Sequence, residues 1–218
     1  IRLGDAQMTE MPKAYVQALF DQYAPRFEHT LINDLGYRAP NLIFKAVLAA
    51  RVAAKKPAFF KRAIDLGCGT GLAAAAFAKQ VDDFIGIDLS PGMIKEARAT
   101  GLYAELEVAD MIDGLRGKPD ASANLVVAAD AMVYLSDLMP VLCEARRVLA
   151  QGGTLAFTLE THDGKGVILG EGLRYAHATE YVREAIAKAG LKLLTLEPAS
   201  PRNENNEPVR GLVIVAEK

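Results

Sequence analysis

The segment over residues 63–71, Ala-Ile-Asp-Leu-Gly-Cys-Gly-Thr-Gly, most constrains what this chain can fold into. It predicts a buried strand that finishes with an acidic residue, then a glycine-rich turn, and then a helix over residues 72–80. Glycine has no Cβ and tolerates positive φ, so such a turn lets a ligand approach the backbone closely. We therefore expect a strand–turn–helix unit with a ligand at the turn.

The spacing of the glycines argues against a dinucleotide at this turn. A dinucleotide site needs glycine at the first, third and sixth positions, which lets helix and strand pack closely beneath a pyrophosphate. Counted from Gly67, the third position is Gly69, but the sixth is Leu72 and glycine stands at the fifth, Gly71. Asp65 precedes the turn, where a carboxylate repels a pyrophosphate and attracts an amine. The ligand implied is cationic near the turn and carries no phosphate.

Strand and helix patterns alternate along most of the chain. The expected strands cover residues 62–66, 84–88, 105–109, 124–129, 154–159, 191–196 and 211–216. Such alternation is typical of a parallel α/β sheet with helices on both faces. No helix is expected between the last two strands, so we predict that they pair antiparallel. In open sheets of this kind the ligand binds beyond the carboxyl ends of the strands.

Helix starts are indicated by capping residues and prolines. One helix is expected to begin at Pro12 and to end by Pro25, and a second to begin after Pro40. The residues expected to cap helices are Asn41, Ser90, Ser136 and Thr179.

The run Asp65-Leu-Gly-Cys-Gly-Thr-Gly71 resembles the first motif of class I S-adenosylmethionine-dependent methyltransferases. Their cofactor bears an ammonium, a sulfonium and a carboxylate but no phosphate, and its product is S-adenosylhomocysteine. The resemblance implies an α/β, Rossmann-like, doubly wound sheet of seven strands, mostly parallel, with the last strand antiparallel between the fifth and sixth. It also implies one domain, with an N-terminal helical lid over residues 1–57 and the cofactor-binding core over residues 58–218.

By this resemblance, acidic strand ends hold the cofactor. Asp65 would accept hydrogen bonds from the amino group of the cofactor. Asp88 would accept hydrogen bonds from two ribose hydroxyls, and Asp110 would accept one from the adenine amine. Asp88 and Asp110 could instead simply cap helices or turns, and Met93 could be a core residue rather than an adenine contact. The full expected set is Tyr23, Asp65, Gly67, Cys68, Gly69, Asp88, Leu89, Met93, Ala109, Asp110, Met111 and Ala129.

Three residues are candidates for catalysis. The protein must align the acceptor with the methyl carbon and exclude water, and a general base is needed only for a phenol, hydroxyl, amine or carbon acid. His177 is the preferred base because it follows the fifth strand, on the side where acceptors bind in this fold. Asp130, at the end of the fourth strand, is a second candidate, and Tyr134 could orient an acceptor. The alternative for His177 is an exposed or helix-capping role.

Composition narrows the functional classes. The formal net charge of −2 gives no basic excess for a nucleic-acid surface, and no apolar run is long enough to span a bilayer. Two cysteines on different elements suggest no disulfide framework and favour a reducing, cytoplasmic compartment. The three histidines lack metal-ligand spacing, so no metal is expected. Oligomeric state stays open.

Segments outside the core motif narrow the family further. Residues 15–27, 35–40, 173–177 and 208–211 resemble an uncharacterised bacterial branch in which the methyltransferase domain often follows tetratricopeptide repeats. The leading hypothesis is a small-molecule methyltransferase, because Asp130-Ala-Met-Val lacks the Asn/Asp-Pro-Pro-Tyr/Phe signature of many nucleobase and glutamine methyltransferases. A protein acceptor remains open. One alternative is a non-catalytic S-adenosylmethionine-binding module. The other is an NAD-dependent oxidoreductase, although Asp65 and Leu72 argue against a dinucleotide site.

Overall fold

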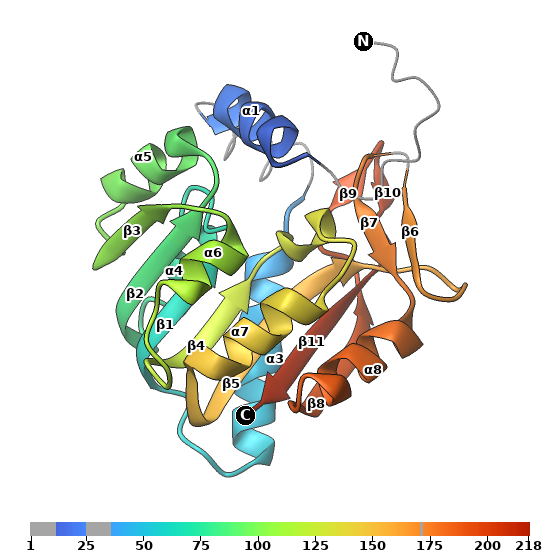
Figure 1. The fold of residues 1–218 in the computed structure, drawn as a ribbon. Helices are drawn as coiled ribbons and strands as arrows, with labels where there is room; N and C mark the ends of the chain where they lie inside the picture. Colours follow the sequence, from blue (N-terminus) through green and yellow to red (C-terminus); the bar gives the residue numbers. More distant parts are fainter. Residues whose placement is uncertain (1–11, 25–35, 171) are drawn as a thin grey trace.

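A computed structural model describes residues 12–24, 36–170 and 172–218. Its central sheet has the strand order β3-β2-β1-β4-β5-β11-β8 (Figure 1). These strands are β1 (Phe60–Leu66), β2 (Val81–Asp88), β3 (Glu105–Val108), β4 (Ala123–Ala128), β5 (Leu149–Glu160), β8 (Lys192–Ala199) and β11 (Gly211–Glu217).

The pairing of the strands confirms the predicted fold class. β1 lies between β2 and β4 and is parallel to both, whereas β11 lies between β5 and β8 and is antiparallel to both. The connection from β8 to β11 contains no helix, only the short strands β9 (Asn203–Glu204) and β10 (Glu207–Pro208). A parallel neighbour would need a crossover of a dozen or more residues, so the last strand returns antiparallel.

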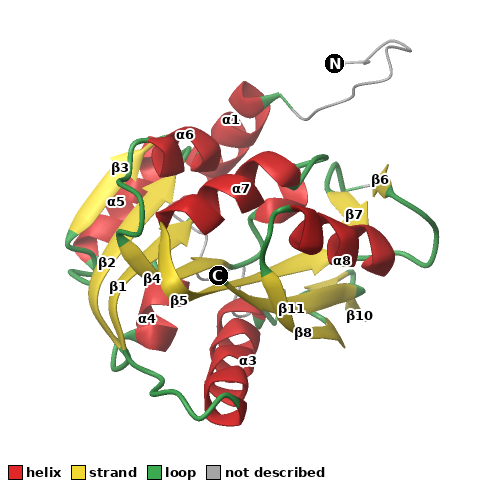
Figure 2. Cartoon of the chain, turned by 60° about the horizontal axis from the view of Figure 1, so that its bottom comes forward, coloured by secondary structure: helices red, strands yellow, loops and turns green. Residues whose placement is uncertain are grey.

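Helices cover both faces of the sheet (Figure 2). On one face, α6 (Met111–Arg116), α7 (Met139–Val148) and α8 (Thr179–Lys188) cover a core that includes Leu66, Ile87 and Phe157. On the other face, α3 (Ala39–Ala53) and α4 (Leu72–Phe77) cover a second core around Phe77 and Val213. Strands buried from both sides read as continuous apolar runs, which is why β4 was recognisable in the sequence.

Of the four predicted helix caps, Ser90 is right and the other three are wrong by one to three residues. Ser90 caps α5 (Pro91–Ala99), and its hydroxyl accepts a hydrogen bond from the Met93 amide at 3.0 Å. Asn41 is not a cap, because α3 takes Pro40 into its first turn and so begins at Ala39.

Ser136 and Thr179 are not N-caps either. Leu138 is the N-cap of α7, and the carboxylate of Asp137 accepts from the first amide of that helix, at Met139. Thr179 is the first residue of α8, with Ala178 as its N-cap.

Several elements near the sheet edge were not predicted. The short α6 follows β3, the 3-10 helix η3 (Met132–Tyr134) follows β4, and β6 (Val167–Leu169) pairs with β7 (Tyr175–His177). α1 (Lys13–Tyr23) lies above the carboxyl ends of the central strands (Figure 1). Within the described ranges, every helix is too short or too polar to cross a lipid bilayer.

Candidate functional site

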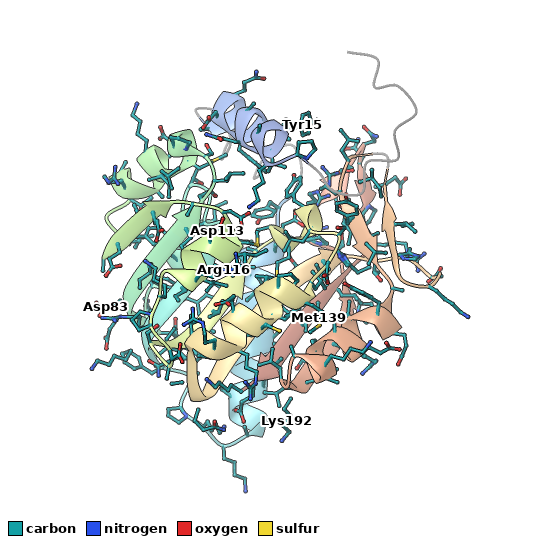
Figure 3. The ribbon with its side chains drawn as sticks, viewed as in Figure 1. Tyr15, Asp83, Asp113, Arg116, Met139 and Lys192 are labelled. Carbon is teal, nitrogen blue, oxygen red and sulfur yellow. The ribbon has the colours of Figure 1, made fainter. Side chains whose placement is uncertain are left out.

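A cavity of about 690 Å³ opens at the carboxyl ends of the strands. Its walls are the glycine turn after β1, the ends of β2, β3 and β4, the segment from η3 to the start of α7, and one side of α1. Tyr15 of α1, which Figure 3 labels, lies over this end of the sheet and also lines the cavity. The position is the one expected for a ligand in an open α/β sheet.

The glycine turn brings bare backbone to the cavity wall. Gly67, Gly69 and Gly71 have φ values of +63°, +53° and +103°, all in the left-handed region. A Cβ on Gly67 would lie 2.5 Å from the Cβ of Ala131, in the segment that follows β4. Glycine is therefore required at this position by both backbone conformation and space.

Asp65 is a fully buried carboxylate with one oxygen still free of a protein partner. Its Oδ2 accepts a hydrogen bond from the hydroxyl of Tyr103 at 2.7 Å, whereas Oδ1 has no partner among the described residues. Burial raises the pKa of Asp65 to about 7; the Tyr103 hydrogen bond opposes that shift and Asp88 adds to it. A cation beside Oδ1 would favour the ionised form.

Sequence reasoning missed Tyr103, which lies between α5 and β3. Its ring occupies the space beside Gly86, where a Cβ would come within 2.9 Å of it. The signal was present, because an isolated glycine inside a strand indicates close approach of another group. Nothing in the sequence, however, says which aromatic residue fills that space.

Asp88 ties the glycine turn to the end of β2. Its two oxygens accept hydrogen bonds from the backbone amides of Gly69, at 2.9 Å, and Ser90, at 2.8 Å. Burial raises the pKa of Asp88, and these two amides oppose the shift. The capping role considered as an alternative is therefore real, although a carboxylate has about four lone-pair sites and keeps room for further donors.

Asp110 also has a capping role. It is the N-cap of α6 and accepts from the amide of Ile112 at 3.0 Å. The ammonium of Lys13, on α1, lies 3.4 Å from the same carboxylate and 3.6 Å from Asp113. Asp110 lines the cavity, so capping does not remove it from a ligand's reach.

Most of the predicted site residues share this one cavity. The residues that line it are Asp65, Gly67, Cys68, Gly69, Asp88, Leu89, Ala109, Asp110, Met111, Ala129, Asp130 and Tyr134. Met93 does not line it: only 1% exposed, it packs in the core, so the core alternative holds for this residue. Tyr23 lies on α1, but its side chain falls outside what the structure describes. Ligand binding by these residues stays a prediction.

His177 does not reach the cavity, which removes the geometric basis for its choice as base. It is fully buried in β7, its Nε2 is 2.9 Å from the carbonyl oxygen of Leu135, and its ring stacks on Tyr181. Burial lowers its pKa to about 4. The strand pair β6–β7, which the sequence did not predict, carries this residue into the interior instead of leaving it on an open loop.

Asp130 lines the cavity as part of a partly buried ionic group that we call the ion cluster: Asp130, Glu160, Glu204, Arg174 and Arg202. Arg202, only 3% exposed, donates to Asp130 at 2.5 Å, to Glu204 at 3.0 Å and to Glu160. Arg174 donates to Glu160 at 2.7 Å and to Glu204. Burial raises the pKa of Asp130, and Arg202 opposes the shift.

Part of the ion cluster could have been found from the sequence. Glu160 ends β5, as the aspartates end the earlier strands, so the strand-end pattern extends to it. Arg202 lies in the polar segment between β8 and β9, where no local pattern marks it. Asp130 has a φ of +57°, a conformation that is uncommon for residues other than glycine and that is frequent at functional sites.

α1 is attached to the rim of the cavity at three points. The carboxylate of Asp21 accepts from the Ser90 hydroxyl at 2.5 Å and from the Gly92 amide at 3.1 Å, at the start of α5. Lys13 pairs with the start of α6, where Figure 3 labels Asp113. The ring of Phe20 meets that of Tyr134 edge-on at 5.6 Å.

Comparison with known proteins gives a consistent family. A family model described as a methyltransferase domain matches residues 64–157. Human methyltransferase-like protein 27 is 31% identical over 176 residues, which are 79% of this chain and 66% of that protein. Trans-aconitate 2-methyltransferase of Methylobacterium radiotolerans is 36% identical over 113 residues, 51% of this chain and 41% of that enzyme. The chain thus spans two thirds or less of the length of these curated relatives.

Solved structures with the same fold are more distant in sequence. The cyclase SpnF superimposes with a TM-score of 0.75 at 19% identity, over 96% of this chain and 97% of that one. A 1,6-didemethyltoxoflavin-N1-methyltransferase of Burkholderia thailandensis, with S-adenosylhomocysteine bound, gives 0.69 at 15% identity, over 98% and 92%. At such identities the likeness establishes the fold alone, and the fold hosts more than one chemistry.

Proposed function

The chain belongs to the class I S-adenosylmethionine-dependent methyltransferases, and from this premise we propose that it methylates a small-molecule acceptor. One observation carries the proposal. The glycine turn and the strand-end carboxylates Asp65, Asp88 and Asp110 open on a single cavity, which continues past them to Asp130 and Tyr134. A transferase needs both ends of such a cavity, one for the methyl donor and one for the acceptor.

The residues at the donor end suit the family's cofactor. Asp65 has a buried oxygen without a partner in the described part of the chain, and an ammonium would supply both the hydrogen bonds and the charge that it lacks. The turn at Gly67 and Gly69 exposes backbone that a side chain would otherwise cover. Asp88 and Asp110 retain acceptor sites for ribose hydroxyls and an adenine amine, and the described residues of the cavity wall include no surplus of basic groups for phosphates.

Little covalent work is asked of the protein. The bound cofactor supplies a methyl group on a positively charged sulfur, which a nucleophile can take by in-line displacement. The chain's own residues hold the two reactants in line and keep water out. We assign contact with the acceptor to Asp130 and Tyr134, which line the cavity in the segment after β4, and assign no part to His177.

We further propose that, within residues 1–57, α1 acts as a lid on the core at residues 58–218, whereas α3 packs on the sheet. The support is the set of contacts from α1 to the rim, made by Lys13, Asp21 and Phe20. Closing such a lid would exclude water from the methyl carbon. The resemblance to a branch fused to tetratricopeptide repeats stays a prediction, because the names of the relatives do not bear on it.

A small acceptor is favoured by the name of one curated relative described above, which specifies trans-aconitate. The test is incubation of the protein with methyl-tritiated S-adenosylmethionine and a metabolite extract, followed by separation of small molecules from protein. Label in a small organic product supports the proposal. Label on protein contradicts the small acceptor, and intact binding of S-adenosylhomocysteine without any transfer indicates a non-catalytic module.

A further inference from the structure

The acceptor end of the cavity carries a charge pattern that restricts what can bind there. We infer that the acceptor is a neutral or cationic molecule with an apolar body and an amine or hydroxyl group, and that carboxylates and phosphates are rejected. This inference rests on the proposed function, because it assumes that the acceptor occupies the end of the cavity near Asp130 and Tyr134.

Acidic groups outnumber basic ones along the described cavity wall. Six carboxylates line it, whereas its basic side chains are Lys13, Arg174 and Arg202. In a partly enclosed space of low dielectric, charges of one sign focus the field and raise the local concentration of the opposite sign. The field alone therefore favours cations over anions. The six carboxylates are Asp65, Asp88, Asp110, Asp130, Asp137 and Glu204.

The basic groups of this wall are already committed to carboxylates. All three guanidinium nitrogens of Arg202 donate hydrogen bonds, to Asp130, Glu160 and Glu204. Two guanidinium nitrogens of Arg174 donate hydrogen bonds, to Glu160 and Glu204. An incoming carboxylate would have to compete with Asp130, Glu160 and Glu204 for these guanidinium groups, inside a cluster where carboxylates already outnumber guanidiniums.

Lys13 offers an anion little more. Its ammonium lies beside Asp110 and Asp113, and its side chain is 62% exposed at the outer edge of the cavity. Screening by water and salt makes an exposed ammonium a weak partner.

Asp130 presents the complementary feature. Its Oδ2 pairs with Arg202, whereas its Oδ1 is buried and has no hydrogen-bond partner among the described residues. The ion cluster has three carboxylates and two guanidiniums, so it keeps a negative charge when all its groups are ionised. A buried acceptor atom without a partner is costly, and a ligand that brings an N–H or O–H group removes that cost.

The rest of this end is apolar. Val16, Leu19 and Phe20 of α1 face the cavity, together with Leu135 and Pro140. Such walls suit a flat or aliphatic body and leave orientation to a few polar groups. The chain therefore differs in expected specificity from its trans-aconitate-methylating relative, whose named acceptor is a polycarboxylate.

The test uses three probes of matched size: benzylamine, benzyl alcohol and benzoate. Binding is measured by ligand-observed NMR, with and without saturating S-adenosylhomocysteine. We expect saturable binding of benzylamine and benzyl alcohol, at least about tenfold tighter than that of benzoate. Asp130→Asn should reduce the preference for benzylamine over benzoate several-fold. Asp163→Asn makes the same charge change at an exposed ion pair outside the cavity and should leave the preference unchanged.

Each outcome decides the inference. Benzoate binding as tightly as benzylamine, or no binding of any probe at its solubility limit, overturns it; so does an unchanged preference in a folded Asp130→Asn protein. Should that variant fail to fold, the wild-type ranking still decides. Failure to bind S-adenosylhomocysteine contradicts the proposed function instead. In that case the affinities of the three probes, measured without S-adenosylhomocysteine, still decide the charge preference of the cavity.

Discussion

The two ends of the cavity treat buried carboxylates in opposite ways. At the glycine turn, Asp65 has only the Tyr103 hydroxyl and no positive charge beside it, so its pKa rises to about 7. After β4, Asp130, whose side chain is 11% exposed, pairs instead with Arg202. A buried carboxylate with no cation beside it favours a charged ligand, whereas one paired with a built-in cation leaves only its second oxygen for a ligand's N–H or O–H group.

The largest expected effect is at the paired end. Arg202→Met should lower the free energy of unfolding by about 3–5 kcal/mol, because it removes the cation that pairs with the largely buried carboxylates of Asp130 and Glu160. Arg210→Met is the matched control: it removes an exposed pair with Asp163 and should change stability little. Urea denaturation at pH 7 measures both. Equal losses in the two variants would show that the ion cluster has no structural role.

The unpaired carboxylate of Asp65 should make the free energy of unfolding depend on pH. The pKa of Asp65 rises from 3.8 to about 7 on folding, so the native state holds its proton longer than the unfolded state does. Stability from this group is therefore full below about pH 4 and is lost as pH rises through 7. Relative to Asp65→Asn, the wild-type protein should lose on the order of 3–4 kcal/mol between these limits.

Denaturation of both proteins across this pH range, without ligand, measures that difference. Asp163→Asn provides a contrast of opposite sign, because Arg210 lowers the pKa of Asp163. If the difference in unfolding free energy between wild type and Asp65→Asn does not vary with pH, the pKa of Asp65 is not raised in the folded protein.

The glycine turn allows a comparison between two glycines of the same backbone conformation. Gly67→Ala places a Cβ 2.5 Å from Ala131, whereas Gly101→Ala, at a φ of +68°, meets nothing within 4 Å. Both variants carry the strain of a left-handed residue, but only the first deforms the cavity wall. Calorimetry should give an S-adenosylhomocysteine affinity at least about tenfold weaker for Gly67→Ala, or about 1.4 kcal/mol. Gly101→Ala should bind S-adenosylhomocysteine as tightly as the wild type. A similar loss of affinity in both variants would mean that backbone strain, and not the shape of the cavity wall, causes the effect.

The smallest expected effect belongs to Tyr103. Its hydroxyl lowers the pKa of Asp65, so Tyr103→Phe should raise that pKa. Because an ammonium ligand favours ionised Asp65, the affinity for S-adenosylhomocysteine should rise with pH through about 7 in the wild type and at higher pH in the variant. The affinities should differ a few-fold near pH 7 and converge at pH 9. A constant ratio at every pH would indicate a purely structural role for Tyr103.

The donor end was more predictable from the sequence than the acceptor end. The glycine turn and the aspartates at the ends of β1, β2 and β3 lie in contiguous strand–turn–helix units, so local pattern and topology place them together. The ion cluster joins Asp130, Glu160 and Arg202 across up to 72 positions, and such contacts depend on packing that no local pattern encodes.

The errors have physical causes of the same kind. The burial of His177 is not predictable from the sequence, because β6 and β7 are three-residue strands, too short to show a period of two. Helix starts moved where a proline fits within the first turn, as Pro40 and Pro140 do. The antiparallel last pair needed no such detail, since the missing helix indicates it, and the place of the last strand between the fifth and sixth followed from the family resemblance.

The most direct test of the central claim compares two ligands that differ only at the amino-acid end. Calorimetry on the wild type and on Asp65→Asn should use S-adenosylhomocysteine and 5′-methylthioadenosine, which lacks the amino group. We predict that the substitution weakens S-adenosylhomocysteine at least about tenfold and leaves 5′-methylthioadenosine almost unchanged. Equal weakening of both ligands, or a wild-type protein that ignores S-adenosylhomocysteine and takes up NAD, would contradict the role assigned to the unpaired carboxylate.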